Sequence, residues 1–249
     1  MPRRSIRWLL AIVTAAFCLA AVTVSAGVAH GSIMPMANDR FNDTSPHFGG
    51  AFITSTLGTC TAGFSVFDQN GFPGSVTAGH CGPDGTNYSA PSTGFYGQIR
   101  GQILNGIADM ARLESVFQPV TYAPIIHTGP SAPTTRTVKG KADPDADDLV
   151  CVSGAITEAK CDLRVLPGKH SLCYFTPVGP ACTHGLTIAE RLNATVVTRG
   201  DSGGPVYTRS GATGAIINGM IIGQSGDHHV YFHTVSEIES RLGVRVMTG

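Results

Sequence analysis

The sequence has no lysine-rich run and no excess of positive charge. Its 249 residues contain 17 Lys and Arg against 17 Asp and Glu. Three of the arginines lie in the first 29 residues, so the remainder carries 14 positive and 17 negative side chains, a net of −3 (14 − 17). Nucleic-acid binding needs a basic footprint, so this balance argues against it and we expect no nucleic-acid partner.

Long hydrophobic runs are also missing, apart from one at the N-terminus. The chain begins "MPRRSIRWLLAIVTAAFCLAAVTVSAGVAH", with an arginine-rich start, an apolar run from Trp8 to Val24, and small residues around Ala26 and Ala29. This pattern is typical of a secretory signal peptide cleaved near Ala26 or Ala29. A retained membrane anchor is the alternative, because the run is close to the ~17 residues that can span a bilayer. We favour cleavage, a secreted protein and no stable membrane association afterwards.

No two cysteines have the Cys-x-x-Cys spacing that many metal sites use. Six cysteines follow the signal, and an even number in a secreted chain predicts disulfides formed in an oxidising compartment. Six cysteines can pair in many ways, but the short separations favour local loops. The expected pairs are Cys60–Cys81, Cys151–Cys161 and Cys173–Cys182.

Helical periodicity is nearly absent. From Gly49 on, short β-branched and aromatic runs alternate with clusters of Gly, Pro, Asn and Asp, as strands bounded by turns do. An all-β sandwich or barrel is therefore predicted. The exception is "HTVSEIESRLGVRV", where Thr234 and Glu237 have capping-box spacing and Gly243 can end a helix. We interpret it as a packing helix without a chemical role.

Composition shifts divide the chain into segments. A Pro-, Thr- and Asp-rich passage separates two strand-rich halves of similar size, which suggests two barrels with a cleft between them. The predicted segments are a signal peptide (1–29), a short mobile leader (30–48), an N-terminal β-barrel (49–127), a linker with a surface loop (128–149), and a C-terminal β-barrel with the terminal helix (150–249).

The candidate nucleophile is Ser202, in "VVTRGDSGGPVYT". A serine hydroxyl is a weak nucleophile and needs a base, usually a histidine, oriented by a third group. His80 ends an apolar strand in "SVTAGHC", beside Cys81, whose disulfide would fix its backbone. Asp109 lies inside the apolar run "NGIADMARLES" and is either buried and paired or an outward-facing strand residue. The other candidate bases are His127, His170, His184, His228, His229 and His233.

The motifs "TAGHC", "ADMARL" and "GDSGGP", in this order, resemble those of the chymotrypsin-type serine proteases, and more narrowly the secreted bacterial streptogrisin and α-lytic branch. The resemblance runs from about Gly49 to Val246. It implies two antiparallel six-stranded β-barrels with a C-terminal helix.

By this resemblance, His80 is the general base, Asp109 orients it, and Ser202 is the nucleophile. The backbone N–H groups of Gly200 and Ser202 would form the oxyanion hole. The resemblance also implies that Asp201 pairs with an internal arginine, which the sequence does not identify.

The substrate pocket is assigned in the same way. Val196 occupies the position where a preference for Arg or Lys would place an aspartate, which disfavours that preference. Ile222, Gly223 and Gln224 match the segment that pairs with the substrate backbone, and Ile222 replaces the usual serine. Three histidines near this wall are predicted to be exposed loop residues: His228, His229 and His233. The alternatives are recognition of an acidic side chain by one of them and weak metal binding by His229 and His233, which would share one strand face.

Together these features predict a secreted, monomeric serine endopeptidase that hydrolyses polypeptides through an acyl-enzyme. No cofactor and no metal are expected. The alternative is a catalytically inactive, protease-like secreted binding module.

Overall fold

Most of the short β-branched runs of the sequence form strands, as predicted, but residues 194–200 form loop and turn instead. The structure is a computed structural model that describes residues 39–91, 93–116, 120–176 and 179–249. The predicted signal peptide (1–29) and the first part of the predicted leader (30–38) lie outside the described residues. No helix within the described ranges is long and apolar enough to cross a membrane.

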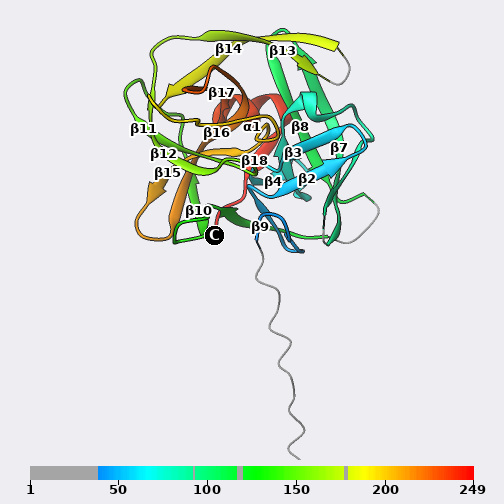
Figure 1. Cartoon of the computed structure of the whole chain (residues 1–249). Helices are drawn as coiled ribbons and strands as arrows, with labels where there is room; N and C mark the ends of the chain where they lie inside the picture. Colours follow the sequence, from blue (N-terminus) through cyan, green and yellow to red (C-terminus); the bar gives the residue numbers. More distant parts are fainter. Residues whose placement is uncertain (1–38, 92, 117–119, 177–178) are drawn as a thin grey trace, which may run out of the picture. The chain divides into compact units, whose positions relative to one another are not determined.

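The N-terminal half forms an eight-stranded sheet in the order β18-β4-β5-β8-β7-β6-β2-β3. Since β3 and β4 are consecutive parts of residues 58–68, this order returns to its start, and six strand segments close a ring. Figure 1 shows β2, β3, β4, β7 and β8 of this sheet lying close together. The segment that connects β3 to β4 is also paired: the Gly63 N–H donates to the Val76 carbonyl of β5, and the Ala62 carbonyl accepts from the Gly50 N–H, both at 2.7 Å. The strands are β2 (Phe52–Ser55), β3 (Gly58–Thr61), β4 (Ser65–Asp68), β5 (Pro73–Thr77), β6 (Asn87–Ala90), β7 (Gly94–Asn105), β8 (Ala108–Glu114) and β18 (Val244–Val246).

The C-terminal half belongs to a ten-stranded sheet that contains a second closed ring. Antiparallel pairings run from β16 through β15, β11, β12, β14 and β17 back to β16, which makes six strands. The all-β, two-barrel prediction is thereby confirmed. The ring and its attached hairpin consist of β11 (Leu149–Gly154), β12 (Glu158–Val165), β13 (His170–Thr176), β14 (Gly179–Glu190), β15 (Pro205–Ser210), β16 (Gly214–Ser225) and β17 (His229–Thr234).

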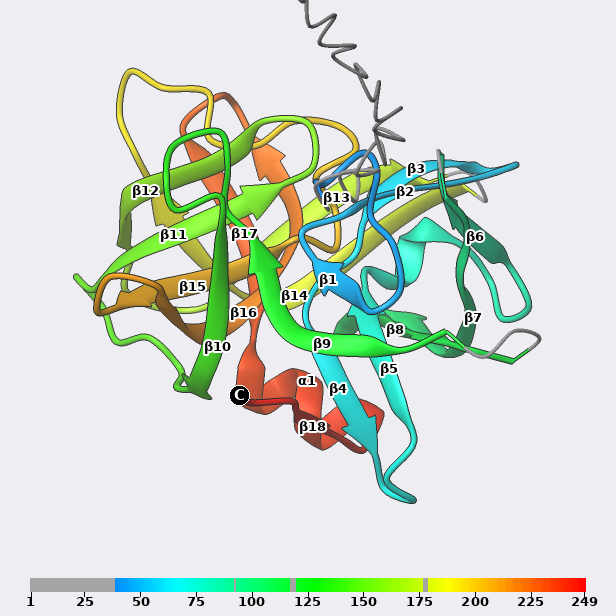
Figure 2. The same ribbon diagram turned by 90° about the horizontal axis from the view of Figure 1, so that it is seen from below.

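Three further strands join the two barrels. They are β1 (His47–Gly49), β9 (Tyr122–His127) and β10 (Thr135–Lys141). The pairs β1–β9 and β10–β16 are parallel, so the sheets are not antiparallel throughout. Figure 2 shows β9 passing beside β1 and leading into β10 at the C-terminal barrel.

Two predicted connecting segments contribute to the folded core. In the predicted leader, Arg40, Asp43 and His47 are 5%, 0% and 2% exposed. In the predicted linker, β10 buries Arg136 and Val138. Polar and Pro-rich composition suggested surface chain at both places, but hydrogen-bonded buried polar side chains and strand pairing hold both segments in the fold.

The predicted C-terminal helix is α1 (Val235–Leu242). Thr234 and Glu237 form the capping box, with the Thr234 backbone N–H 3.2 Å from the Glu237 carboxylate. Gly243, at φ 63°, ends the helix in the left-handed conformation. The chain then enters β18, which pairs with β4 of the N-terminal barrel.

Candidate active site

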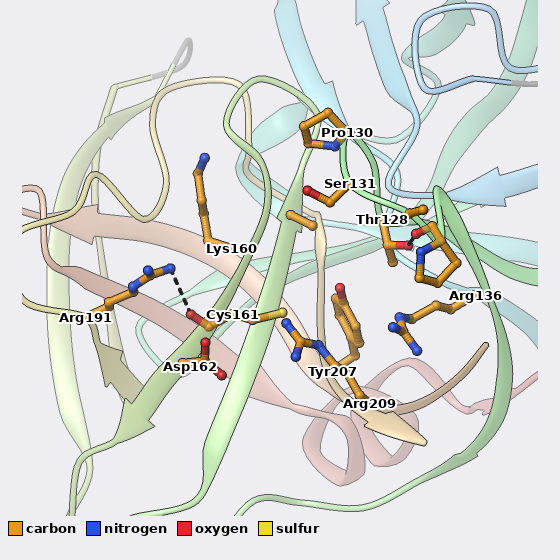
Figure 3. A pocket seen from close by; sticks show the side chains of 13 residues that line it. Thr128, Pro130, Ser131, Arg136, Lys160, Cys161, Asp162, Arg191, Tyr207 and Arg209 are labelled. Carbon is orange, nitrogen blue, oxygen red and sulfur yellow. Dashed lines mark hydrogen bonds between the residues drawn. The ribbon is translucent and has the colours of Figure 1, made fainter. Parts of the chain in front are cut away.

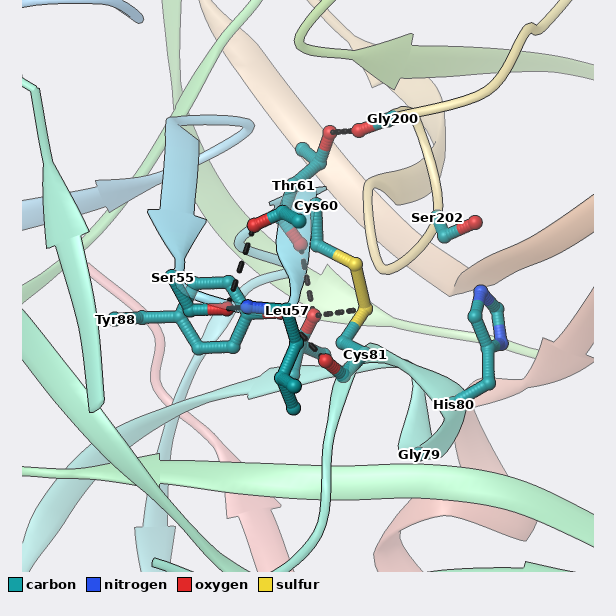
Figure 4. The surroundings of a disulfide bond; sticks show 12 residues. Ser55, Leu57, Cys60, Thr61, Gly79, His80, Cys81, Tyr88, Gly200 and Ser202 are labelled. Carbon is teal, nitrogen blue, oxygen red and sulfur yellow. Dashed lines mark hydrogen bonds between the residues drawn. A yellow bond between two sulfur atoms is a disulfide. The ribbon is translucent and has the colours of Figure 1, made fainter. Parts of the chain in front are cut away.

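His80 and Asp109 form a two-point contact in the N-terminal barrel. His80 lies in a single 3₁₀ turn, η1 (Gly79–Cys81), directly after β5, and Asp109 lies in β8. His80 Nδ1 is 2.6 Å from Asp109 Oδ2, and the His80 backbone N–H donates to Asp109 Oδ1 at 2.7 Å. The Cys60–Cys81 disulfide ties this turn to β3 (Figure 4). Backbone and imidazole of His80 are therefore both fixed against one carboxylate, and Asp109 is 0% exposed, which resolves the two alternatives for this residue.

Tyr174 is a third member of this group that sequence reasoning did not identify. Its hydroxyl donates to Asp109 Oδ2, and its ring meets the His80 ring edge-on with centroids 5.1 Å apart. Burial favours a neutral Asp109, but the charge of His80 and the hydrogen bonds from His80 and Tyr174 outweigh it and lower the Asp109 pKa below its ordinary value. Burial and the Asp109 charge raise the pKa of Tyr174, so it stays a hydrogen-bond donor.

The position of Tyr174 follows from a hairpin disulfide. Cys173 and Cys182 face each other across β13 and β14 and are bonded. Tyr174 directly follows the first cysteine, so the disulfide holds the strand that carries the phenol. The third bond, Cys151–Cys161, links β11 and β12, and all three are the local pairs that the sequence separations favoured.

His233 supports Asp109 from the other barrel. The Asp109 backbone N–H donates to His233 Nε2 at 3.2 Å, and His233 Nδ1 lies 3.3 Å from Glu237 Oε2. Because Nε2 accepts this hydrogen bond, it carries no proton. The ring proton is therefore on Nδ1 and points to Glu237. His233 is 1% exposed, so the prediction of an exposed loop residue was wrong for it, whereas His228 and His229 are partly exposed.

Glu237 is held in its charged form. Burial raises its pKa, but the hydrogen bond from His233 and the charge of Lys169, 3.2 Å away, lower the pKa to about 2. A carboxylate in the first turn of α1 thus orients the imidazole that receives the Asp109 N–H.

Ser202 lies next to His80 in a cleft of about 710 Å³ lined by both residues (Figure 4). Its hydroxyl makes a long hydrogen bond, 3.4 Å, to the Ile222 carbonyl. Thr61 fixes the loop before it: the Thr61 N–H donates to the Ser202 carbonyl and the Thr61 hydroxyl to the Gly200 carbonyl, both at 2.8 Å. The serine and the histidine are thereby presented to the same space.

Gly200 is required by the shape of this loop. Its φ is 100°, a conformation that other residues rarely adopt, and a Cβ there would lie 2.9 Å from Ile156 Cγ1. The backbone N–H groups of Asp201, Gly203 and Gly204 donate to carbonyls of the surrounding chain. Those of Gly200 and Ser202 have no backbone acceptor in the described chain, so both remain available as donors.

Among the described residues, Asp201 does not form the arginine ion pair that the resemblance implied. Within the described ranges its carboxylate instead accepts four hydrogen bonds, from the N–H groups of Ile156, Thr157 and Thr198 and from the Thr157 hydroxyl, at 2.7–3.1 Å.

The Arg40 guanidinium lies close to the Asp201 carboxylate, with the backbone of Gly154 between them. The guanidinium donates to the carbonyls of Gly154, Gly50 and Gly129 and to the Ser153 hydroxyl. A Cβ on Gly154 would lie 2.1 Å from Asp201 Cγ. Burial lowers the Arg40 pKa, while the negative charges of Glu158 and, next, Asp201 raise it. Asp201 and Arg40 thus interact electrostatically across Gly154.

The predicted pocket residues are only partly brought together. Ile222, Gly223 and Gln224 line the cleft, but Val196 is 0% exposed and packs in the core of the C-terminal barrel. None of the described lining residues is acidic, and the lining includes the exposed Arg199.

The fold and the cleft define a double-β-barrel protein with a histidine–aspartate pair facing a serine. No family model matches the chain, and no curated protein matches it. Thermobifida fusca protease A is 28% identical, with a TM-score of 0.65, and the match covers 81% of this chain and 98% of that one. Nocardiopsis protease (26%, TM-score 0.65) and Cellulomonas bogoriensis chymotrypsin (27%, TM-score 0.63) have the same coverages. The chain therefore has the fold of the bacterial chymotrypsin-like serine proteases, which confirms the resemblance found in the sequence.

Proposed function

We propose that the chain is a secreted serine endopeptidase with Ser202 as nucleophile, His80 as general base and Asp109 as the group that orients His80. One observation carries the proposal. Asp109 binds Nδ1 of His80 while the histidine and Ser202 line the same cleft, so Nε2 remains for the serine.

The reaction would begin when the Ser202 hydroxyl turns from the Ile222 carbonyl to His80 Nε2. The serine oxygen attacks the scissile carbonyl as its proton passes to Nε2, and the N–H groups of Gly200 and Ser202 donate to the oxyanion. Asp109 stabilises the imidazolium without taking its proton. His80 then protonates the leaving amine, and a water deprotonated by His80 hydrolyses the acyl-enzyme to regenerate Ser202.

Substrate would bind as a strand along residues 222–224. The pairing of β15 with β16 reaches Met220, and β17 pairs with the opposite edge of the same stretch, at Gly223 and Gln224. Main-chain pairing of this kind does not use the side chain of Ile222, which is 1% exposed, so replacement of the usual serine is compatible with it. With no acidic group in the described lining, we infer that neutral side chains are preferred next to the cleaved bond.

A fluorophosphonate probe tests the proposal, because it reacts with an activated serine. The purified protein should be labelled once, and labelling should disappear in Ser202→Ala and His80→Ala. Ser225→Ala and His229→Ala, which change exposed or half-exposed residues, are the matched controls and should label normally. Absence of labelling in a well-folded protein would instead support the inactive binding module.

The secreted location has its own test. N-terminal sequencing of the protein recovered from the culture medium should give a chain that starts shortly after Ala26 or Ala29. A chain that stays with the membrane fraction and retains its first residues would contradict cleavage. Sedimentation of the mature protein should give the mass of a monomer.

A further inference from the structure

A second pocket lies on the C-terminal barrel and shares no lining residue with the cleft. Its volume is about 390 Å³, within the range of roughly 300–1,000 Å³ typical of small-molecule sites. Residues 128–133 form one wall, β12 and β15 supply most of the rest, and Arg136 of β10 and Arg191 after β14 complete the lining (Figure 3).

The lining of this pocket is strongly cationic. It contains Arg136, Lys160, Arg191 and Arg209 against a single carboxylate, that of Asp162. None of the four cations has a carboxylate within 4.0 Å in the described chain, not even Asp162. Elsewhere, four other cations are engaged in ion pairs: Arg112, Lys141, Arg164 and Lys169.

The Tyr207 hydroxyl is a further hydrogen-bond donor in this pocket. It is 1% exposed, and its hydroxyl forms no hydrogen bond to any described residue. Figure 3 shows this hydroxyl directed into the pocket, with the Arg136 and Arg209 side chains close to the ring. Burial raises the pKa of Tyr207, and the positive charges of Arg136, Arg209 and Arg40 offset only part of this, so the phenol stays protonated at neutral pH. Because the hydroxyl is accessible from the pocket, it can donate a hydrogen bond to a ligand that enters there.

Two of the cations are held in place before any ligand arrives. Arg136 is 8% exposed, and its guanidinium donates to the Gly214 carbonyl at 3.0 Å. Arg191 donates to the Cys161 carbonyl at 3.1 Å. Donors fixed in this way lose little freedom on binding, which favours recognition of an anion.

We propose that this pocket binds a compact phosphate-bearing anion, with the Tyr207 hydroxyl and the neighbouring Arg136 and Arg209 side chains as its central donors. Lys160 and Arg191 lie on the opposite side of the pocket from Arg136 (Figure 3). An anion with more than one phosphate group can contact both sides, so tripolyphosphate should bind more tightly than inorganic phosphate. This site is independent of the proposed protease activity.

Calorimetric titration of the full chain carrying Ser202→Ala, which prevents self-digestion, tests the proposal with tripolyphosphate and inorganic phosphate as probes. We expect one site per chain and tighter binding of tripolyphosphate. Arg209→Gln should weaken binding about tenfold, because one charge-assisted hydrogen bond is lost. Tyr207→Phe should weaken it several-fold. Arg245→Gln, the same charge change on an exposed residue of β18, is the control and should change binding less than twofold.

Three results would overturn the proposal. One is no binding of either probe at low salt. Another is an equal loss in Arg209→Gln and Arg245→Gln, which would mean that only net charge matters. The third is a set of amide chemical-shift changes centred on the cleft rather than on residues 128–133 and β15. Arg209 is exposed, so its variant should remain folded, and circular dichroism checks this.

Discussion

Two buried aspartates in this molecule bind a histidine in nearly the same way. Asp109 Oδ2 lies 2.6 Å from His80 Nδ1, and Asp43 Oδ2 lies 2.6 Å from His47 Nδ1. Both carboxylates are 0% exposed, and each also accepts a backbone N–H, from His80 in one case and from Phe48 in the other. By contact geometry alone, the two pairs are equivalent.

The surroundings of the two aspartate–histidine pairs are different. His47 is 2% exposed, its ring lies 4.3 Å from that of Tyr96, and its Nε2 is buried with no partner in the described chain. The other oxygen of Asp43 contacts His127 Nε2 at 3.1 Å, so this cluster fastens the N-terminal segment to β9. His80 instead reaches the cleft beside Ser202. A carboxylate–imidazole contact is thus a structural connection, and access together with a nearby hydroxyl makes it a candidate for catalysis.

Replacing each aspartate by asparagine should show most clearly that the two pairs have different roles. Asp109→Asn should lower kcat by about 10⁴-fold, because the amide would hold the wrong tautomer of His80. Asp43→Asn should lower the free energy of unfolding by about 2–3 kcal/mol through a damaged buried network, while kcat per folded molecule stays unchanged. Active-site titration combined with urea unfolding measures both. A large drop of kcat in Asp43→Asn would assign it a role that the geometry does not.

The next largest effect concerns Arg40, in the same N-terminal segment as Asp43. Arg40→Met should cost about 3 kcal/mol of unfolding free energy, because buried carbonyls lose their donor. It should also slow fluorophosphonate labelling of the folded protein, since Asp201 would lose the nearby positive charge. Arg100→Met, an exposed control, should change neither quantity. Equal labelling rates in folded Arg40→Met and wild type would limit this segment to a stabilising role.

A smaller effect should follow from Tyr174, because no tyrosine hydroxyl among the described residues donates to Asp43; the Tyr96 hydroxyl donates to the Phe48 carbonyl instead. Its hydroxyl lowers the Asp109 pKa, so Tyr174→Phe should raise that pKa and reduce kcat/KM about tenfold. Because Asp109 must be ionised, the acidic limb of the pH–rate profile should move to higher pH. Tyr231→Phe, on a partly exposed residue of β17, serves as the control. An unshifted profile would show that Tyr174 only packs against His80.

The smallest effect should come from Glu237, whose pKa is lowered from 4.5 to about 2. A lowered pKa means that the charged form stabilises the fold above about pH 4.5, and that this contribution disappears as the pH falls through about 2. Glu237→Gln should therefore be about 1 kcal/mol less stable at neutral pH, and the difference should vanish near pH 2. Thermal unfolding across this pH range measures it; a constant difference would contradict the assignment.

The sequence predicted the parts that depend on local pattern. Strand-and-turn alternation identified the all-β fold, the capping box identified α1, and the motifs around His80 and Ser202 identified the cleft. What it missed depends on long-range contact. Tyr174 and His233 reach Asp109 from distant strands, and no spacing in the sequence indicates that they meet it. Arg40 was missed because a charged residue in a polar stretch ordinarily lies on the surface.

The link from α1 through His233 to Asp109 has a consequence for the order in which the protein is made. A ribosome produces β17, which carries His233, and then α1 and β18 after every other described element. The Asp109 backbone therefore obtains its imidazole acceptor, and the edge of β4 its partner strand, only late in synthesis. A nascent chain that already carries His80, Asp109 and Ser202 still lacks part of the support for this site until β17 and α1 have been made.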